Sequence, residues 1–253
     1  MLSKVKAIVR HQRMDMPRLG TRKLYYLLKG EFEANGLKVG RDKLFDLLRM
    51  SHMLVSTSKS YTKTTWSKHW LRKHPNLVKH TTVNKAEQLW VSDITYVKTK
   101  KQNCFVSLVT DAYSRRIMGY HVSEDLKAES VVQAFKMAVA ERVYTHPLIH
   151  HSDRGIQYCA DPYQQLLHKH GVQCSMTDGY DCYQNALAER VNGILKQEFL
   201  LHTPENSSQL RKIVAQSVNI YNAKRPHLSL KMKTPDYVHK EKSLIGYSIR
   251  DYY

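Results

Sequence analysis

Cysteine is scarce in this 253-residue chain, and its few copies are scattered. Cys104, Cys159, Cys174 and Cys182 form no C-x-x-C pair. This spacing argues against a zinc module and against a disulfide framework, both of which place cysteines in closer or more regular sets. We therefore expect four ordinary reduced thiols.

Long apolar runs are also missing. No segment reaches the roughly 18 consecutive apolar residues of a membrane-spanning helix, and the N-terminus "MLSKVKAIVRHQRMD" has no apolar core of signal-peptide length. The sequence therefore predicts a cytoplasmic protein with no membrane partner.

Acidic residues are in short supply relative to basic ones. The chain has 22 Asp and Glu against 40 Lys and Arg, a formal net charge of +18. The imbalance is concentrated near the N-terminus, because residues 1–88 hold 19 of the basic and only 6 of the acidic side chains. Such a distribution favours a polyanionic partner, with nucleic acid first among the candidates.

The basic N-terminal part has helical spacing. "TRKLYYLLKGEFEANG" from Thr21 and "RDKLFDLLRM" from Arg41 predict two short helices joined by a Gly-containing turn. We interpret residues 1–54 as a small all-α, helix-turn-helix-like DNA-binding domain, although any helical hairpin with a solvated basic face gives the same pattern. The candidate DNA contacts in it are Arg22, Lys23, Arg41 and Lys43.

Residues 55–87 are polar and basic and lack sustained periodicity, which predicts a linker. Tyr61, Trp66 and Trp70 are interleaved with its lysines. Aromatic side chains in such a setting either stack on nucleic-acid bases or anchor the linker to the next domain, and we favour anchoring for the tryptophans.

From residue 88 the pattern changes to strands and then to helices. Three strands over 88–99, 103–114 and 115–123 follow one another at hairpin distances. A helix over 127–143, a short strand "LIHHS", a helix over 161–171, a strand over 172–177 and a helix over 185–201 come next. This order predicts an α/β fold over residues 88–240, with a mixed five-stranded sheet flanked by helices on both faces, before a tail at 241–253.

Three carboxylates stand where such a sheet gathers ligands. Asp93 lies within the first strand, Asp153 ends the "LIHHS" strand, and Glu189 lies near the start of the last helix. The crossover rule places the strand that ends at Asp153 beside the first strand or near it, and the helix bearing Glu189 could cross the same end of the sheet. Three carboxylates this close would repel one another unless a cation sits between them. Oxygen ligands favour Mg²⁺ or Mn²⁺ over zinc or copper. Lys196, seven residues after Glu189, shares its helix face and is suitably placed for a phosphate.

Each carboxylate also has a plainer interpretation. Asp93 could pair with an arginine across the sheet, Asp153 could cap a turn ahead of Gly155, and Glu189 could be a solvated helix residue. Asp111, at the end of the second strand, is a decoy or an accessory group.

The roles of several neighbouring polar residues also remain open. We expect one of His150 and His151 to face the core and the other the surface. Gln157 and Asn185 suit either loop structure or contacts near the site. For three residues near the C-terminus, a phosphate contact and a clamp on the terminal segment both remain open: Tyr221, Arg225 and His227.

Four segments, taken in order, resemble a known family. They are "WVSDITY", "HSDRGIQY", "YDCYQNALAERVNGILKQE" and "YNAKRPHLSLKMKTPDYV". With 35 residues between Asp153 and Glu189, the chain resembles the DDE transposases and retroviral integrases. More narrowly, it resembles the second-frame product (OrfB) of bacterial insertion sequences of the IS-three group, over essentially its whole length. One departure is Glu189-Arg190-Val191-Asn192, where many relatives have Glu-Ser-Phe-Phe, and it affects how the helix packs and meets DNA.

The resemblance implies a ribonuclease H-like integrase core and Mg-dependent polynucleotidyl transfer. Asp93, Asp153 and Glu189 would be catalytic and would hold two Mg²⁺ ions about 3.5 to 4 Å apart, with Mn²⁺ as a substitute. Water would be the nucleophile in DNA cleavage, and the freed 3′-hydroxyl in strand transfer. Lys196 and Arg225 join the candidate DNA-binding residues.

The implied partners are double-stranded DNA at the element ends and target, a first-frame OrfA partner or fusion, and further copies of the chain on DNA. The implied location is the bacterial cytoplasm, in association with the nucleoid. Two other functions remain as alternatives: a structure-selective nuclease of the same fold, and a non-enzymatic DNA-binding regulator.

The basic N-terminal helices generate a first prediction. If Arg22 and Lys23 contact DNA phosphates, replacing both with alanine lowers affinity and reduces the slope of log K against log salt by about 2. Binding titrations at several salt concentrations measure this slope. An unchanged slope would return both residues to a solvated face.

Overall fold

The computed structural model describes residues 1–56, 70–79, 81–178 and 185–241. Tyr61 and Trp66, for which we predicted anchoring or stacking, lie outside these residues. The helices are α1 (Leu2–Asp15), α2 (Thr21–Ala34), α3 (Arg41–Met50), α4 (Ala128–Ala140), α5 (Ile156–Cys159), α6 (Asp161–Lys169), α7 (Ala186–Ile194), α8 (Ser207–Lys224) and α9 (Pro235–Lys240). The strands are β1 (Leu89–Lys98), β2 (Asn103–Asp111), β3 (Ile117–Ser123), β4 (Ile149–Ser152) and β5 (Gln173–Met176), with a π-helical turn η2 (Leu195–Phe199) and a 3₁₀ turn η3 (Leu228–Leu230).

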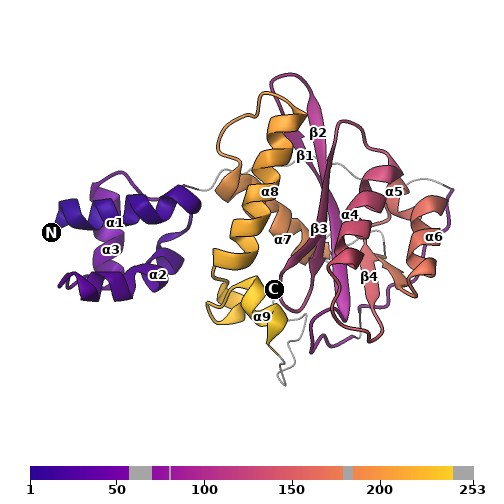
Figure 1. Cartoon of the computed structure of the whole chain (residues 1–253), viewed down its shortest axis with the longest axis horizontal. Coiled ribbons are helices and arrows are strands. Elements are labelled where there is room, and N and C mark those ends of the chain that lie inside the picture. Colours follow the sequence, from indigo (N-terminus) through magenta and orange to yellow (C-terminus); the bar gives the residue numbers. More distant parts are fainter. Residues whose placement is uncertain (57–69, 80, 179–184, 242–253) are drawn as a thin grey trace.

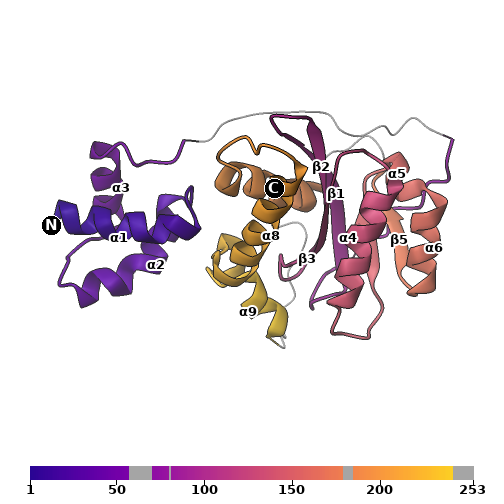
Figure 2. The same ribbon diagram turned by 45° about the horizontal axis from the view of Figure 1, so that its top comes forward.

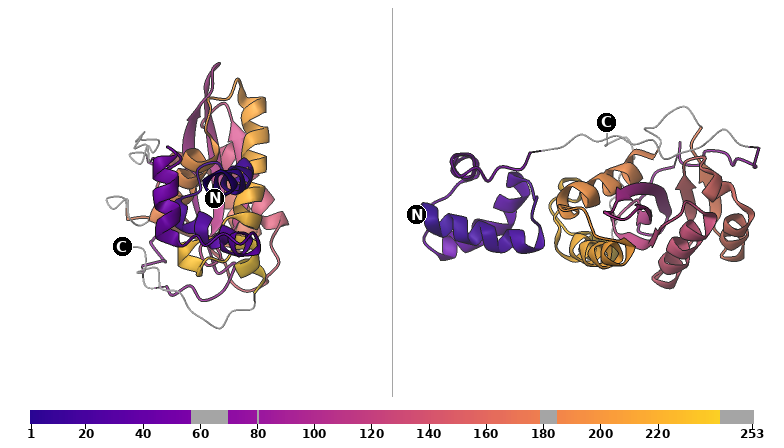
Figure 3. Two further views of the ribbon diagram at one scale, coloured as in Figure 1. Left: turned by 90° about the vertical axis from the view of Figure 1, so that its left-hand side faces the viewer. Right: turned by 90° about the horizontal axis from the view of Figure 1, so that it is seen from above.

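Helices α1, α2 and α3 surround a hydrophobic core of their own. Its buried side chains recur four residues apart, as at Leu24 and Leu28 of α2 and at Leu44 and Leu48 of α3, so each helix turns one apolar stripe inward. We had predicted α2 and α3 but not α1. Figure 3 shows the three helices together at one end of the molecule, beyond α8 and α9.

The remaining part of the chain is built on one mixed sheet. Its strand order is β3-β2-β1-β4-β5. The pairs β1·β2 and β2·β3 are antiparallel, whereas β1·β4 and β4·β5 are parallel. The predicted five-stranded sheet and its preceding helical region are therefore confirmed, and β4 lies directly beside β1 as the crossover rule requires.

Helices cover both faces of the sheet, as Figures 1 and 2 show. On one face, α4, α5 and α6 pack over a core that includes Trp90, Phe135 and Met176. On the other, α7, η2 and α8 pack over a core that includes Val106 and Tyr221. The two layers bury both sides of β1, so any polar side chain on that strand needs a specific partner.

The segment before β1 is held along the sheet edge by its backbone. The Met176 amide of the edge strand β5 donates to Pro75 O (3.3 Å), and the Leu77 amide donates to Ser175 Oγ (2.9 Å). Leu71 packs against the core, but Trp70 is 92% exposed. For Trp70 the predicted anchoring role is therefore wrong, since backbone hydrogen bonds and Leu71 hold this segment instead.

A buried ionic contact fastens α9 to the beginning of β1. His239 Nε2 lies 3.1 Å from Glu87 Oε1, and its Nδ1 lies 2.9 Å from Ser114 Oγ and 3.8 Å from Asp111 Oδ1. Although burial opposes a charge here, the interactions with Asp111 and Glu87 raise the pKa of His239 to about 9. Asp111, our decoy, thus has a structural role in tying α9 to the sheet.

The packing of α4 on β3 generates the second prediction. A Cβ at Gly119 would lie 2.1 Å from Ala134 O and 2.7 Å from Ala138 N, which are helix backbone atoms that cannot move aside. We expect Gly119→Ala to lower the free energy of unfolding by about 3 kcal/mol or more. Denaturant titration followed by circular dichroism measures the change.

Gly30 provides the matched control, because nothing lies within 4 Å of a Cβ placed there in the interior of α2. Gly30→Ala should increase stability by about 0.5 to 1 kcal/mol, since alanine favours a helix over glycine. A Gly119→Ala protein as stable as the parent would contradict the close contact between α4 and β3.

Candidate active site

Asp93 lies in the middle of β1, on the face that α7 covers. It pairs with Leu108 of β2, and strand alternation places its side chain on the same face as Thr95 and Val97. The carboxylate is half-buried, in a strand that has neighbours on both sides. Its position is therefore fixed by the sheet.

Asp153 follows the last residue of β4, which pairs in parallel with β1 through Val91 and His151. Its Oδ1 accepts a hydrogen bond from the Gly155 amide (3.0 Å), so the carboxylate does cap the turn, as its plainer interpretation proposed. A Cβ at Gly155 would lie 3.0 Å from the same oxygen. Glycine thus lets the backbone approach the carboxylate closely and leaves its position at the strand end undisturbed.

Glu189 lies in the first turn of α7 and is exposed. Two asparagine amides tie this helix to β1. Asn185 Nδ2 donates to Ser92 O (2.9 Å), and Asn192 Nδ2 donates to Asp93 Oδ2 (2.8 Å). Because these bonds end on adjacent residues of one strand, they hold the turn bearing Glu189 over Asp93.

The three carboxylates affect one another electrostatically. Burial raises the pKa of Asp93 to about 7, and the charges of Asp153 and Glu189 act in the same direction, while the hydrogen bond from Asn192 opposes them. Burial and the charge of Asp153 likewise raise the pKa of Glu189. The sheet and α7 therefore bring together the three acids that the sequence singled out.

The three acids are not drawn into a tight cluster. Within the described parts of the chain, no three His, Cys, Asp or Glu side chains are close enough together to hold a metal ion as they stand. The exposed Glu189 side chain has room to turn toward the two aspartates, so shared coordination needs a rotation about its side-chain bonds.

Several buried oxygens around these acids have no hydrogen-bond partner within the described parts of the chain. They are the Tyr158 hydroxyl, the Asn185 Oδ1 and the Asn192 Oδ1. Asp153 and Asp93 are among the groups that raise the pKa of Tyr158, after burial, so its phenol lies close to both. Unsatisfied buried oxygens beside raised-pKa carboxylates fit the hydration shell of a hard cation.

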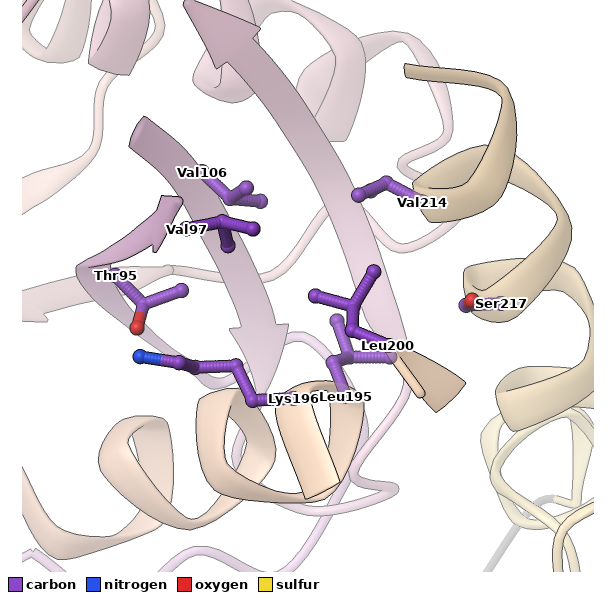
Figure 4. A pocket seen from close by; sticks show the side chains of 8 residues that line it. All are labelled: Thr95, Val97, Val106, Leu195, Lys196, Leu200, Val214 and Ser217. Atoms are coloured by element: carbon purple, nitrogen blue, oxygen red, sulfur yellow. The ribbon is translucent and has the colours of Figure 1, made fainter. Parts of the chain in front are cut away.

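Lys196 approaches the same face of β1 from η2. Its side chain extends toward Thr95 along a small pocket lined by Val97, Leu195 and Leu200, as Figure 4 shows. Burial lowers the pKa of Lys196, and the negative charge of Asp93 counteracts this shift. Lys196 thus places a cation beside Asp93, from the π-helical turn that follows α7.

His150 and His151 are both buried, so the expectation that one of them faces the surface is wrong. His150 Nε2 lies 2.7 Å from Ser92 Oγ and 2.9 Å from the Tyr163 hydroxyl, and His151 Nδ1 lies 2.8 Å from Ser175 Oγ. Burial, with His151 next to it, lowers the pKa of His150 to about 3. Both rings are buried hydrogen-bonding groups because β4 is covered on each face.

Gln157 also has a structural partner. Its Nε2 donates to Leu126 O (2.9 Å), which links α5 to the loop before α4.

Among the predicted DNA contacts, three are exposed on the N-terminal helices. Arg22 lies on α2, and Arg41 and Lys43 lie on α3. The Arg41 guanidinium interacts with its neighbour Asp42 (2.8 Å). These three side chains are open to a phosphate backbone.

The other two predicted DNA contacts, Lys23 on α2 and Arg225 after α8, are less exposed. Arg225 is only 1% exposed and makes two bonds to Glu198 (2.8 and 2.6 Å) and one contact to His227 Nε2 (3.2 Å). Burial, followed by the charge of Arg225, lowers the pKa of the half-buried Lys23 to about 8. This arrangement supports the clamp for Arg225 and His227, and a DNA contact by Lys23 or Arg225 stays a prediction that their burial does not favour.

Two family profiles match the chain, and both are described as "Integrase core domain". One covers residues 83–182, which include Asp93 and Asp153, and the other covers residues 170–235, which include Glu189. The chain is 35% identical over 214 residues to the insertion element IS600 uncharacterized 31 kDa protein of Shigella sonnei, an alignment that spans 83% of this chain and 77% of that one. It is 32% identical to the transposase for insertion sequence element IS904 of Lactococcus lactis, over 66% of this chain and 70% of that one.

The chain belongs to the insertion-sequence transposases with an integrase core.

Solved structures agree with this at the level of the fold. The simian T-cell lymphotropic virus intasome in complex with PP2A regulatory subunit B56 gamma has a chain similar to this transposase over 94% of its length and 76% of that chain, with a TM-score of 0.57 and 15% identity. The trimeric form of the HTLV-2 integrase catalytic core domain in complex with magnesium matches over 61% of this transposase and 97% of that chain, with a TM-score of 0.50 and 20% identity.

The family assignment decides between the functions left open by the sequence. As a DDE transposase, the protein cleaves DNA and transfers the cut strand, and neither the nuclease nor the regulator alternative is favoured. None of the transposase helices described here is long and apolar enough to cross a membrane.

The raised pKa of Asp93 generates the third prediction. In the folded, metal-free transposase this pKa is about 7, above the roughly 3.9 of an unfolded aspartate. The folded state therefore loses stability as pH rises from about 4 to 7 and stays penalised above 7. We expect Asp93→Asn to raise the free energy of unfolding in EDTA by about 1 to 2 kcal/mol at pH 8, and by less at pH 5.

Asp161→Asn is the control, because Asp161 is exposed at the start of α6. It should leave the pH dependence of unfolding unchanged. A loss of stability in Asp93→Asn at pH 8 would show that the carboxylates are not under electrostatic strain.

Proposed function

We propose that Asp93, Asp153 and Glu189 are the catalytic carboxylates of this transposase and that they bind two Mg²⁺ ions, with Mn²⁺ able to substitute. The observation that carries the proposal is electrostatic: besides burial, the charge of Asp153 raises the pKa of both Asp93 and Glu189, and the charge of Glu189 raises that of Asp93. A protein can retain such repulsion in its metal-free form when a cation bound during catalysis offsets it.

The residues present fit magnesium. All of the candidate ligands are oxygens. Buried oxygens of Tyr158, Asn185 and Asn192, for which the described residues offer no hydrogen-bond partner, lie in the same region. Hard cations of this kind keep several waters, which need such acceptors and donors. When bound, Mg²⁺ would activate the attacking oxygen and stabilise the leaving 3′ oxygen of the displaced strand.

The protein's own side chains would do the positioning. The sheet fixes Asp93, the turn capped by Asp153 follows the adjacent parallel strand, and α7 carries Glu189 across the same face. Lys196 places a positive charge next to Asp93, where it would neutralise a phosphate flanking the scissile one.

Exposed basic residues of the N-terminal helices would hold more of the DNA. Arg22, Arg41 and Lys43 would contact backbone phosphates of the element end or the target, and their contribution should weaken with salt. We propose the same chain division as the sequence predicts: a DNA-binding domain over 1–54, a linker over 55–87, a catalytic core over 88–240 and a tail over 241–253.

We further propose that the transposase works as a multimer on DNA, in the bacterial cytoplasm and associated with the nucleoid. Two element ends must be handled together, and one fold relative is a chain of a viral intasome. A first-frame OrfA protein or fusion would be an additional partner.

The fourth prediction tests the catalytic assignment. Asp153→Asn keeps the shape of the side chain and its ability to accept from the Gly155 amide, but removes its charge. We expect DNA cleavage and strand transfer to fall together by about a thousandfold or more, with DNA affinity close to that of the parent. Assays with an uncut element end and with a precleaved 3′-hydroxyl end measure the two steps separately.

Asp161→Asn again serves as the matched control and should retain both activities. Cleavage by Asp153→Asn at the parental rate would remove Asp153 from the active site. Loss of joining alone would assign Asp153 to strand transfer only.

A further inference from the structure

Asn192 stands in an unusual position for a buried asparagine. It is 3% exposed, and its Nδ2 donates to Asp93 Oδ2 at 2.8 Å. The residue lies three positions after Glu189 on α7, a spacing that places two helical side chains on one face. A single helix turn thus carries one proposed metal ligand and a hydrogen-bond donor to another.

The orientation of this amide follows from the chemistry of its partner. To bind a metal, Asp93 must be ionised. An ionised carboxylate only accepts hydrogen bonds, so in that state the NH₂ group, and not the carbonyl oxygen, faces Asp93. The other end of the amide, Oδ1, is buried and has no hydrogen-bond partner among the residues that the structure describes. An unsatisfied buried acceptor destabilises the folded state, which is a poor arrangement if the side chain only stabilises the fold.

Asn222 shows what a structural asparagine in this protein looks like. Its Nδ2 donates to Ile117 O and its Oδ1 accepts from Ile117 N, both at 2.9 Å. Both ends of that amide are satisfied by backbone atoms of β3. The Asn192 amide instead uses its donor on a side-chain carboxylate and leaves its acceptor open.

We propose that Asn192 is a positioning residue that prepares Asp93 for metal binding. Its hydrogen bond engages Oδ2 and fixes the carboxylate plane, so that Oδ1 is presented to the cation. The same bond sets the register between β1 and α7, and therefore the distance across which Glu189 must reach. The open Oδ1 of Asn192 is an acceptor for a metal-bound water. This inference rests on the proposed metal-binding role of Asp93.

Removing the donor while keeping the branching of the side chain tests the proposal. Asn192→Leu has the same number of side-chain heavy atoms and lacks both polar atoms. Loss of a group that orients a ligand weakens metal affinity by about 10- to 100-fold. We expect the dissociation constant of Mn²⁺ for the full chain, measured by electron paramagnetic resonance, to rise by that factor, and the Mg²⁺ concentration for half-maximal strand transfer to rise in parallel.

A structural role and a positioning role predict opposite patterns. For Asn192→Leu we expect an unchanged or higher thermal midpoint, because an unsatisfied acceptor is gone, and recovery of strand transfer at saturating metal. Asn222→Leu is the matched control, in which the thermal midpoint should fall while Mn²⁺ affinity stays at the parental value. Asn192→Ser, which is smaller, gives a second variant in which the same weakening of Mn²⁺ binding is expected.

The outcomes separate this inference from the proposed function. If the parent binds Mn²⁺ and both Asn192 variants bind it equally well, the positioning role is overturned while the carboxylate assignment stands. If the parent binds no Mn²⁺ and Asp153→Asn remains active, the proposed metal site and this inference fall together. If strand transfer in Asn192→Leu is lost and cannot be recovered by added metal, Asn192 does not act through metal binding.

Discussion

The burial of a carboxylate beside two others is the constraint around which this transposase is arranged. Asp93 is held in the middle of a covered sheet, where its burial, and then the charges of Asp153 and Glu189, raise its pKa. The surrounding fold must supply the stability that this arrangement costs, and two layers of helices on a five-stranded sheet do so. The energetically unfavourable carboxylate thus lies on β1, a strand that helices cover on both faces.

The helix bearing Glu189 has a limited set of attachments to that strand. Hydrophobic packing by Val191 and Ile194 holds α7 against the sheet, and the amides of Asn185 and Asn192 fix its position along β1. Packing alone is tolerant of small shifts, whereas hydrogen bonds at 2.8 and 2.9 Å are not. The position of α7 along β1 is therefore set by a few hydrogen bonds, in addition to hydrophobic packing that has no directional preference.

Much of the fold could be predicted because its strands are rich in β-branched residues and separated by clear turns. Asp153 could be placed at a strand end for the same reason. Tertiary partners were beyond the reach of periodicity. The role of Asn192 was missed because one asparagine in a helix carries no local signal, although its spacing of three from Glu189 was visible. The burial of both His150 and His151 was not predicted, because alternation along a strand cannot reveal that both faces of β4 are covered. The exposure of Trp70 likewise depends on the segment's backbone bonds to β5.

The buried charge of His239 links the end of the chain to the start of the sheet. Glu87 and Asp111 are both fully buried, and besides His239 the only other cationic group described within 4 Å of either is that of Arg142, 3.6 Å from Glu87. During synthesis, these two acids lack the imidazolium until residue 239 leaves the ribosome. A polypeptide interrupted before α9 would therefore lack the ring that joins Glu87 to Ser114, and the start of β1 would lose its attachment to the C-terminal helix.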